Sequence, residues 1–185
     1  MINKFFIFLF FTINLLVNLH ADEKQLIVDR LIYIDNITFS FEHLTNDKKE
    51  VGTCILVFDN KLICDYENSM KKRILINNKT LVVQKKKYNK NYFYPISNSP
   101  FIKIFNKEKL INLIKISDYK LKNNIELIVI DKNKEKIIIF FDKNSHDLIG
   151  WRIVDQLQNV INFSIKIKYI NSEINSEIFK VPTIN

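Results

Sequence analysis

Two apolar runs flank a short polar turn between positions 52 and 66 of the chain. The turn residues Asp59, Asn60 and Lys61 are of the kind that join antiparallel strands. Because side chains alternate across a strand, one face collects the small and apolar side chains of both runs. These are Gly52, Cys54, Leu56, Phe58, Leu62, Cys64 and Tyr66. The pattern predicts a β-hairpin, one face of which must be covered by a core, a partner or a ligand.

Alternation of apolar and polar positions recurs along most of the chain. It predicts further strands over residues 37–43, 73–77, 80–84, 126–130, 136–141, 148–154 and 160–169. The first of these places Phe39 and Phe41 on one face, and the last has one dry and one wet face. Such one-sided strands are typical of a single curved antiparallel sheet. We therefore expect a meander of short strands.

The turns of this meander have little glycine available, because the 185 residues include only 2 Gly. Asn is the residue that best replaces Gly in left-handed geometry. Asn and Asp lie between the apolar runs, at 59–60, 77–78, 123–124, 131–133 and 142–144. These positions are expected to form the turns.

Two helical regions interrupt the strand pattern. Residues 22–35 have Ile27, Leu31 and Ile34 at helical spacing, with acidic residues at the start. The second helical region is expected to begin where Ser99 can cap a helix whose first residue is Pro100. Its apolar positions are Phe101, Ile102 and Phe105, followed by Leu110, Leu113 and Ile114 on a second segment.

The first 21 residues have the features of a secretory signal peptide. Lys4 supplies the positive charge, an apolar stretch follows over residues 5–17, and Ala21 offers a small residue for cleavage. An uncleaved N-terminal anchor is the alternative, although a spanning helix needs about 20 apolar residues. We find no internal repeat and no flexible linker, so residues 22–185 are expected to form one domain outside the cytoplasm.

The net charge of +8 changes this picture little. No RNA-binding aromatic motif, zinc spacing or helix-turn-helix pattern accompanies it, so nucleic-acid binding is not expected. A basic surface also suits anionic lipid or acidic partners. The run Lys85-Lys86-Lys87 is interpreted as a solvated edge, with docking to an acidic partner as the alternative.

Residues that could support catalysis are scarce. Beyond the leader the histidines are His43 and His146, and no Ser or Cys lies in a nucleophile motif. There is no glycine-rich phosphate loop and no pair of histidines at ligand spacing. We expect no enzymatic activity, no cofactor and no metal site.

Cys54 and Cys64 are the two cysteines of the chain. Outside the cytoplasm they could form a cross-strand disulfide if the hairpin places them opposite each other. A register shifted by one residue would separate them and leave two buried thiols. Both interpretations remain open at this point.

Six segments, taken in order, resemble one known family. They are residues 39–43, 52–66, 76–83, 94–101, 150–155 and 178–182, with His43 where the family has Gln. Together they resemble the LolA family, the outer-membrane lipoprotein carriers of Gram-negative bacteria. The resemblance covers nearly the whole chain after the leader.

The resemblance implies an α+β fold that is mainly antiparallel β. The expected structure is an open β half-barrel covered by an N-terminal helix and a mid-chain helical lid, with an apolar cavity for acyl chains. The cavity-lining candidates are Phe39, Phe41, Cys54, Leu56, Phe58, Leu62, Cys64, Tyr66, Phe101 and Phe105. The implied function is a monomeric periplasmic carrier of acylated lipoproteins. Its partners would be an inner-membrane ABC lipoprotein exporter and an outer-membrane receptor.

Three positions depart from the family pattern. Phe58 and Asp59 stand where the family has an Arg-Pro turn, and Ile63 stands where relatives commonly have a second Arg. The family's turn Arg is thought to hold the lid and help release. An acyl-chain cavity is therefore expected, whereas the presence of the family's lid-latching mechanism is an open question at this point. The alternative function is a LolA-like lipid-binding or envelope-sensing module with a different hydrophobic ligand.

Overall fold

The structure of the protein is a computed structural model. It describes residues 19–45, 48–58, 60–96, 102–130, 135–154 and 157–183. Most of the expected leader, the turn residue Asp59 and the expected helix start at Ser99 and Pro100 lie outside the described residues.

The described residues form one eleven-stranded sheet whose neighbouring strands are all antiparallel. Its strands are β1 (Asn36–Thr45), β2 (Lys48–Val57), β3 (Lys61–Tyr66), β4 (Lys72–Asn77), β5 (Thr80–Lys85), β6 (Lys90–Pro95), β7 (Asp118–Leu121), β8 (Ile125–Ile130), β9 (Lys136–Phe141), β10 (Leu148–Val154) and β11 (Val160–Ile170). The spatial order is β6-β5-β4-β3-β2-β1-β11-β10-β9-β8-β7. Two meanders therefore meet where the first strand pairs with the last, and the sheet stays open at β6 and β7.

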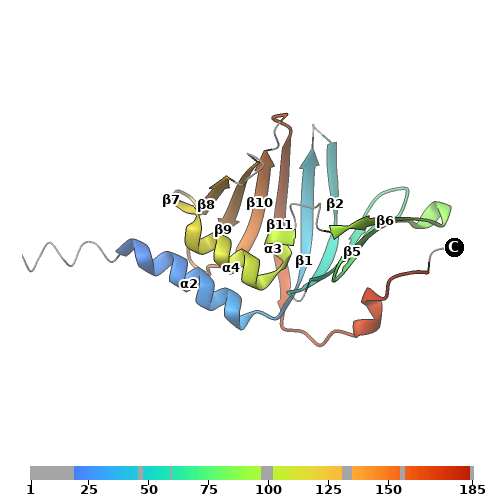
Figure 1. Cartoon of the computed structure of the whole chain (residues 1–185), viewed down its shortest axis with the longest axis horizontal. Helices are drawn as coiled ribbons and strands as arrows, with labels where there is room; N and C mark the ends of the chain where they lie inside the picture. Colours follow the sequence, from blue (N-terminus) through green and yellow to red (C-terminus); the bar gives the residue numbers. More distant parts are fainter. Residues whose placement is uncertain are drawn as a thin grey trace, which may run out of the picture.

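Three α-helices lie on one face of this sheet (Figure 1). They are α2 (Leu19–Tyr33), α3 (Ile102–Phe105) and α4 (Lys107–Ile116). The side chain of Asn106 caps α4 by accepting a hydrogen bond from the Lys109 amide at 2.9 Å. Strands β5 and β6 extend away from the helices, so one half of the sheet is covered and the other is open. This arrangement confirms the expected α+β half-barrel class.

The turns use asparagine as the sequence predicted. Asn60 and Asn78 have φ angles of 61° and 53°, in the left-handed region, at the turns that follow β2 and β4. Asn89 and Asn171 adopt the same geometry. A short side chain that tolerates positive φ thus does the work of glycine in a glycine-poor chain.

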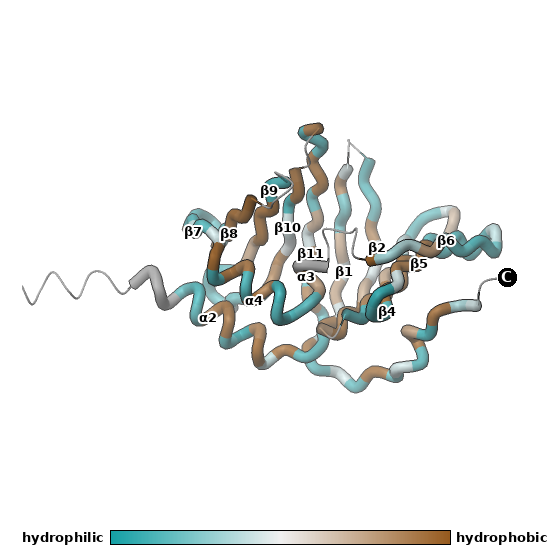
Figure 2. Tube along the Cα trace, viewed as in Figure 1, coloured by the Kyte–Doolittle hydropathy of each residue, from teal (hydrophilic) through white to brown (hydrophobic). Residues whose placement is uncertain are grey.

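Most of the apolar side chains pack between the sheet and the helices, on what we call the inner face. Strands β8 and β9, which lie under the helices, are mostly hydrophobic (Figure 2). Leu110 and Ile114 of α4 are fully buried there, together with Ile27 and Leu31 of α2. The helical spacing seen in the sequence therefore corresponds to helix faces that pack on the sheet.

A second apolar cluster lies on the opposite, outer face and was not predicted. Ile63, Leu75 and Val82 from β3, β4 and β5 are covered there by Phe179 of the 3-10 helix η3 (Ser176–Phe179). The Asn77 side-chain amide donates to the Phe179 carbonyl at 3.0 Å and fixes the C-terminal segment in place. The expectation of one wet face is therefore wrong for this part of the sheet. Ile63, at the second family Arg position, belongs to this outer cluster.

Candidate functional site

The hairpin of β2 and β3 has the register that brings its small and apolar side chains together. Gly52 lies opposite Tyr66, Cys54 opposite Cys64, and Leu56 opposite Leu62. The two cysteine sulfurs are 2.03 Å apart and form a disulfide. The disulfide therefore links β2 to β3 covalently at the centre of the inner face.

The predicted lining residues are almost all buried. Their exposed fractions lie between 1% and 8%, for Phe39, Phe41, Cys54, Leu56, Phe58, Leu62, Cys64, Tyr66 and Phe105. Phe101 lies outside the described residues. The structure thus brings the described candidates together in one buried cluster between the sheet and the helices.

Gly52 is required where it stands because an aromatic ring occupies the space of its missing side chain. A Cβ atom there would lie 2.8 Å from the Phe41 ring and 2.1 Å from the Asp65 carbonyl oxygen. Such contacts are far below van der Waals distance. The glycine therefore lets the Phe41 ring lie flat across the hairpin.

Aromatic rings form a continuous series across the inner face, from the lid to β3. The ring centroids are 5.6 Å apart for Phe105 and Trp151, 4.4 Å for Trp151 and Phe163, 4.9 Å for Phe163 and Phe41, and 4.8 Å for Phe41 and Tyr66. These distances are in the range of favourable ring packing. In this structure the aromatic side chains of the inner face therefore pack on one another in series.

Trp151 and Phe163 were missed as site residues by the sequence reasoning. Each lies on a strand that the alternation pattern predicted, and they face each other in the β10–β11 register. Alternation places Phe163 on the apolar face of its strand. That Trp151 is its stacking partner depends on the β10–β11 register, which the sequence does not give.

An apolar strip continues from the disulfide beyond the helices. Ile74 lies beside Cys64 in the register and pairs with Val83, which pairs with Tyr92 of β6. Ile74 and Leu81 are half-buried, whereas Tyr92 and Tyr94 are 37% and 49% exposed. The inner face of β4, β5 and β6 is therefore an accessible apolar surface continuous with the buried core.

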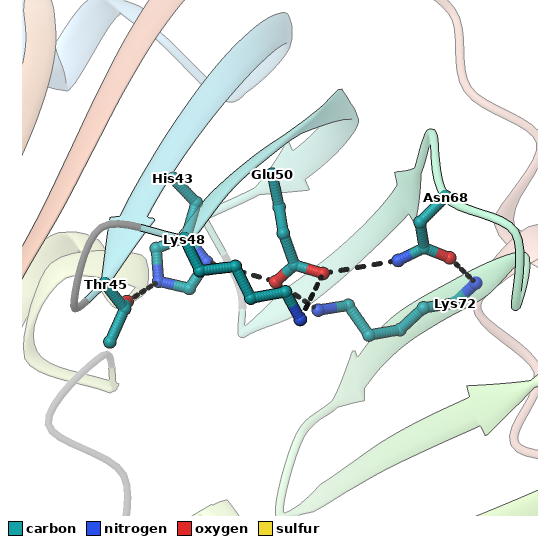
Figure 3. A network of polar contacts seen from close by, with 6 residues as sticks. All are labelled: His43, Thr45, Lys48, Glu50, Asn68 and Lys72. Carbon is teal, nitrogen blue, oxygen red and sulfur yellow. Dashed lines mark hydrogen bonds and ion pairs between the residues drawn. The ribbon is translucent and has the colours of Figure 1, made fainter.

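A polar network closes one end of this face (Figure 3). The Glu50 carboxylate accepts hydrogen bonds from the Lys72 ammonium at 2.7 Å and the Asn68 amide at 3.3 Å. His43 places Nδ1 3.8 Å from the same carboxylate, and its Nε2 is 2.8 Å from the Thr45 hydroxyl. The network surrounds one carboxylate with donors and positive charge.

Electrostatics in this network favour an ionised Glu50 and a neutral His43. Burial alone would raise the pKa of Glu50, but the Lys72 hydrogen bond and the charges of Lys72 and Lys48 lower it below its usual value. Burial lowers the pKa of His43, against the opposing charge of Glu50. Burial and the Glu50 charge both raise the pKa of the Tyr66 hydroxyl. The network therefore places an ionised carboxylate between cations at the end of the inner face.

Contacts between the helices and the hairpin involve few polar side chains. The Lys107 ammonium lies 5.7 Å from the centre of the Phe58 ring and 3.3 Å from the Asp35 carboxylate. The Asn106 side chain donates to that of Asn60 at 3.1 Å. Phe58, at the family's Arg position, thus meets a cation of α4 instead of supplying one.

Two hollows are associated with these elements. One, of about 460 Å³, is open to solvent beside α4 and is lined by Phe58, Asn106, Lys107, Glu108, Ile111, Asn112 and Lys115. The other, of about 350 Å³, involves Gly52 and flanking residues of β1, β2 and β11. Both are open to solvent and lined by polar as well as apolar side chains.

Within the part of the chain that the structure describes, no group of three or more His, Cys, Asp or Glu side chains could hold a metal ion. None of the helices described is both long and apolar enough to cross a membrane.

Residues 38–182 match the family described as "Outer membrane lipoprotein carrier protein LolA". The chain belongs to the LolA family. The match runs from β1 to the C-terminal segment, so it includes the hairpin, α3, α4 and the outer cluster, whereas α2 precedes it. No curated protein sequence matches the chain.

Solved structures share the LolA-like fold at low identity. An uncharacterized conserved protein from Thermus thermophilus is 8% identical with a TM-score of 0.52, and the alignment covers 88% of this chain and 94% of that one. MucB in the Pseudomonas aeruginosa MucA/MucB complex is 8% identical with a TM-score of 0.50, covering 87% of this chain and 61% of that one. A LolA superfamily protein from Nitrosomonas europaea is 11% identical with a TM-score of 0.44, covering 85% and 97%. At these identities the similarity shows the fold alone.

Proposed function

We propose that this LolA-family chain is a periplasmic carrier that binds lipoprotein acyl chains on its inner face. It would take them from an inner-membrane ABC exporter to the outer membrane and pass them to a receptor there. The observation that supports this most is the apolar strip through Ile74 and Leu81, which continues the buried core beyond the helices. Binding and release need no chemistry, so the protein acts as a carrier and not as an enzyme.

Acyl-chain transfer across water requires strong burial that can be reversed. Each buried methylene contributes about 0.8 kcal/mol, so an acyl chain needs an extended apolar surface. In the closed conformation the rings of the aromatic series pack on one another under α3. The acyl chain therefore begins to bind on the apolar strip of β4, β5 and β6. Displacement of α3 and α4 then exposes Phe105 and Trp151, and the two lid states differ in ligand affinity.

The polar contacts of the lid that suit it to such displacement come mostly from flexible lysines at its two ends. At one end Lys107 and Asn106 contact Asp35, Phe58 and Asn60. At the other end Lys24 of α2 donates to the Ser117 carbonyl at 2.6 Å. Interactions of this kind contribute little individually, about 1 kcal/mol or less. The lid of this chain therefore uses a cation on α4 where relatives are thought to use one on the hairpin.

Mass spectrometry of material that co-purifies with the protein from native periplasm tests this function. Triacylated lipoproteins should be found with the wild-type chain. Leu81→Glu places a charge on the apolar strip and should abolish their recovery. Ile130→Glu is the matched control, because Ile130 is 70% exposed on β8, away from the inner face. Equal recovery with both variants would remove the inner face as the binding site.

The fold similarity to MucB supports a second candidate, an envelope-sensing module. MucB is seen in complex with another protein, MucA, and shares the LolA-like fold with this chain. A sensor would bind a lipid and a protein partner without transferring cargo. Recovery of a single protein partner and no acylated cargo from the periplasm would favour this alternative.

A further inference from the structure

The closed end of the β5–β6 hairpin is rich in lysines and exposed tyrosines. This hairpin extends away from the helices (Figure 1). We define the basic tip as residues 67–73 and 85–90, which include the 3-10 helix η1 (Lys86–Tyr88). Two backbone hydrogen bonds join its halves, from the Lys86 amide to the Lys71 carbonyl and from the Lys87 amide to the Met70 carbonyl. Its cations are Lys71, Lys72, Arg73, Lys85, Lys86, Lys87 and Lys90.

Three of these cations have acidic partners. Lys72 binds Glu50, and Arg73 and Lys86 both bind Asp65. Among the described residues, Lys71, Lys85, Lys87 and Lys90 lie within ion-pair distance of no carboxylate. Glu67 is the acidic residue within the basic tip itself. A concentrated positive charge is thus left unbalanced at one end of the molecule.

Tyrosine rings lie among these lysines. Tyr88 is 54% exposed with the Lys87 ammonium 5.7 Å from its ring centre, and the Lys85 ammonium lies 5.3 Å from the ring centre of Tyr92. Tyr has an apolar body and a polar end, and lysine extends a charge on a flexible apolar stem. This combination is typical of protein surfaces that lie in the headgroup region of a bilayer.

We propose that the basic tip docks on the surface of an anionic phospholipid bilayer. Lysines contribute most of its charge, and they suit a diffuse negative surface better than the fixed carboxylate geometry that arginine recognises. Tyr92 belongs both to the basic tip's surroundings and to the apolar strip of the inner face. Docking therefore brings the open edge of the inner face to the membrane, whatever ligand that face carries.

Sedimentation of the purified full chain with vesicles tests the docking. The protein should bind vesicles that contain phosphatidylglycerol, bind phosphatidylcholine vesicles weakly, and lose binding as salt rises. The triple variant K85Q/K87Q/K90Q should bind about a hundredfold more weakly, at about fivefold per lysine. The matched control is K120Q/K143Q/K168Q, which removes the same charge from exposed lysines outside the basic tip. An equal loss in both variants would overturn the site, leaving only attraction by net charge.

A fluorescence measurement locates the contact independently of affinity. The native Trp151 is 1% exposed in the core, so it gives a buried background signal. In the Tyr88→Trp variant, phosphatidylglycerol vesicles that contain brominated lipid should quench the new emission. An absence of quenching while the protein sediments with the vesicles would place the contact elsewhere. An absence of vesicle binding by the wild-type chain, with binding to an acidic protein, would exclude the membrane as the partner.

Discussion

The Lys72 ammonium nitrogen lies 3.6 Å from the centre of the Tyr66 ring. Tyr66 is the last ring of the aromatic series that crosses the inner face, and Lys72 also binds the Glu50 carboxylate. One lysine thus joins the apolar interior to the polar network at its end. The Lys72 ammonium is thus held by two favourable interactions, one with the buried Tyr66 ring and one with the Glu50 carboxylate.

Replacing this cation should destabilise the fold. Lys72→Met leaves the Glu50 carboxylate, whose side chain is 13% exposed, without its main partner. We expect the free energy of unfolding to fall by roughly 2 kcal/mol, as measured by urea denaturation at neutral pH. Lys49→Met is the matched control, since its pair with Glu42 is largely exposed and should contribute under about 1 kcal/mol. Equal effects of the two substitutions would contradict the importance of the Tyr66–Lys72–Glu50 arrangement.

The lowered pKa of His43 predicts a pH dependence of stability. Because the folded state disfavours protonation, the unfolded state binds more protons below the usual histidine pKa of 6.5. The stability contribution is thus complete above about pH 6.5 and decreases as the pH falls below it. His43→Gln removes the titrating group, so its free energy of unfolding should change less between pH 7 and pH 5. Parallel curves for the variant and the wild type would rule out His43 as the cause.

Glu50 makes the free energy of unfolding depend on pH in a second, more acidic range. Its pKa is lowered in the folded state, so its contribution is present above its usual value of 4.5 and is lost as the pH falls below it. Protonation of either group on acidification therefore lowers the free energy of unfolding. In Glu50→Gln the acidic part of the curve should flatten, while the part above about pH 5 should steepen, because loss of the Glu50 charge lowers the pKa of His43 further.

The disulfide between Cys54 and Cys64 closes a short loop at the centre of the inner face. Replacing both residues by Ala should lower the free energy of unfolding by about 3 kcal/mol, mainly through greater freedom of the unfolded chain. Urea denaturation with and without reductant measures this. The reductant should destabilise the wild type and leave the double variant unchanged. If the wild type is equally stable under both conditions, the disulfide makes no contribution.

Lys107 is predicted to bias the lid toward its closed state. Lys107→Met removes the contacts with Asp35 and Phe58, which together are worth about 1 kcal/mol. The open population should rise about fivefold, since 1.4 kcal/mol corresponds to tenfold. Hydrogen exchange of the α4 amides and the uptake rate of a fluorescent acyl probe should both increase. Lys109→Met, on an exposed part of α4, should change neither measurement.

Local patterns were sufficient to predict most of the fold. Alternation identified the strands, and asparagine marked turns that lacked glycine, such as Asn60 and Asn78. Strand β6, residues 90–95, was not among the predicted strands. Its pairing with β5 is set by the turn around Asn89, which has left-handed geometry. The family match and the sheet order agree with the resemblance seen in the sequence.

What the sequence could not give depends on contacts between distant segments. Phe179 lies 102 positions after Asn77 and covers an outer-face cluster that strand alternation alone interprets as solvated. The stacking of Trp151 on Phe163 requires the β10–β11 register. The expected lining residues that the structure describes lie buried on the inner face, and their role in holding an acyl chain stays a prediction. The alternation pattern identifies which residues share the inner face. It does not give how their side chains pack there with the helices.

Photo-crosslinking in the native periplasm tests acyl-chain binding by the inner face most directly. A photoreactive amino acid replaces Leu81 on the apolar strip and, in a second protein, Ile130 on the exposed surface of β8. We predict adducts with acylated lipoproteins from position 81 and none from position 130. Equal labelling from both positions, or no lipoprotein adduct from position 81, would contradict a carrier that holds acyl chains on this face.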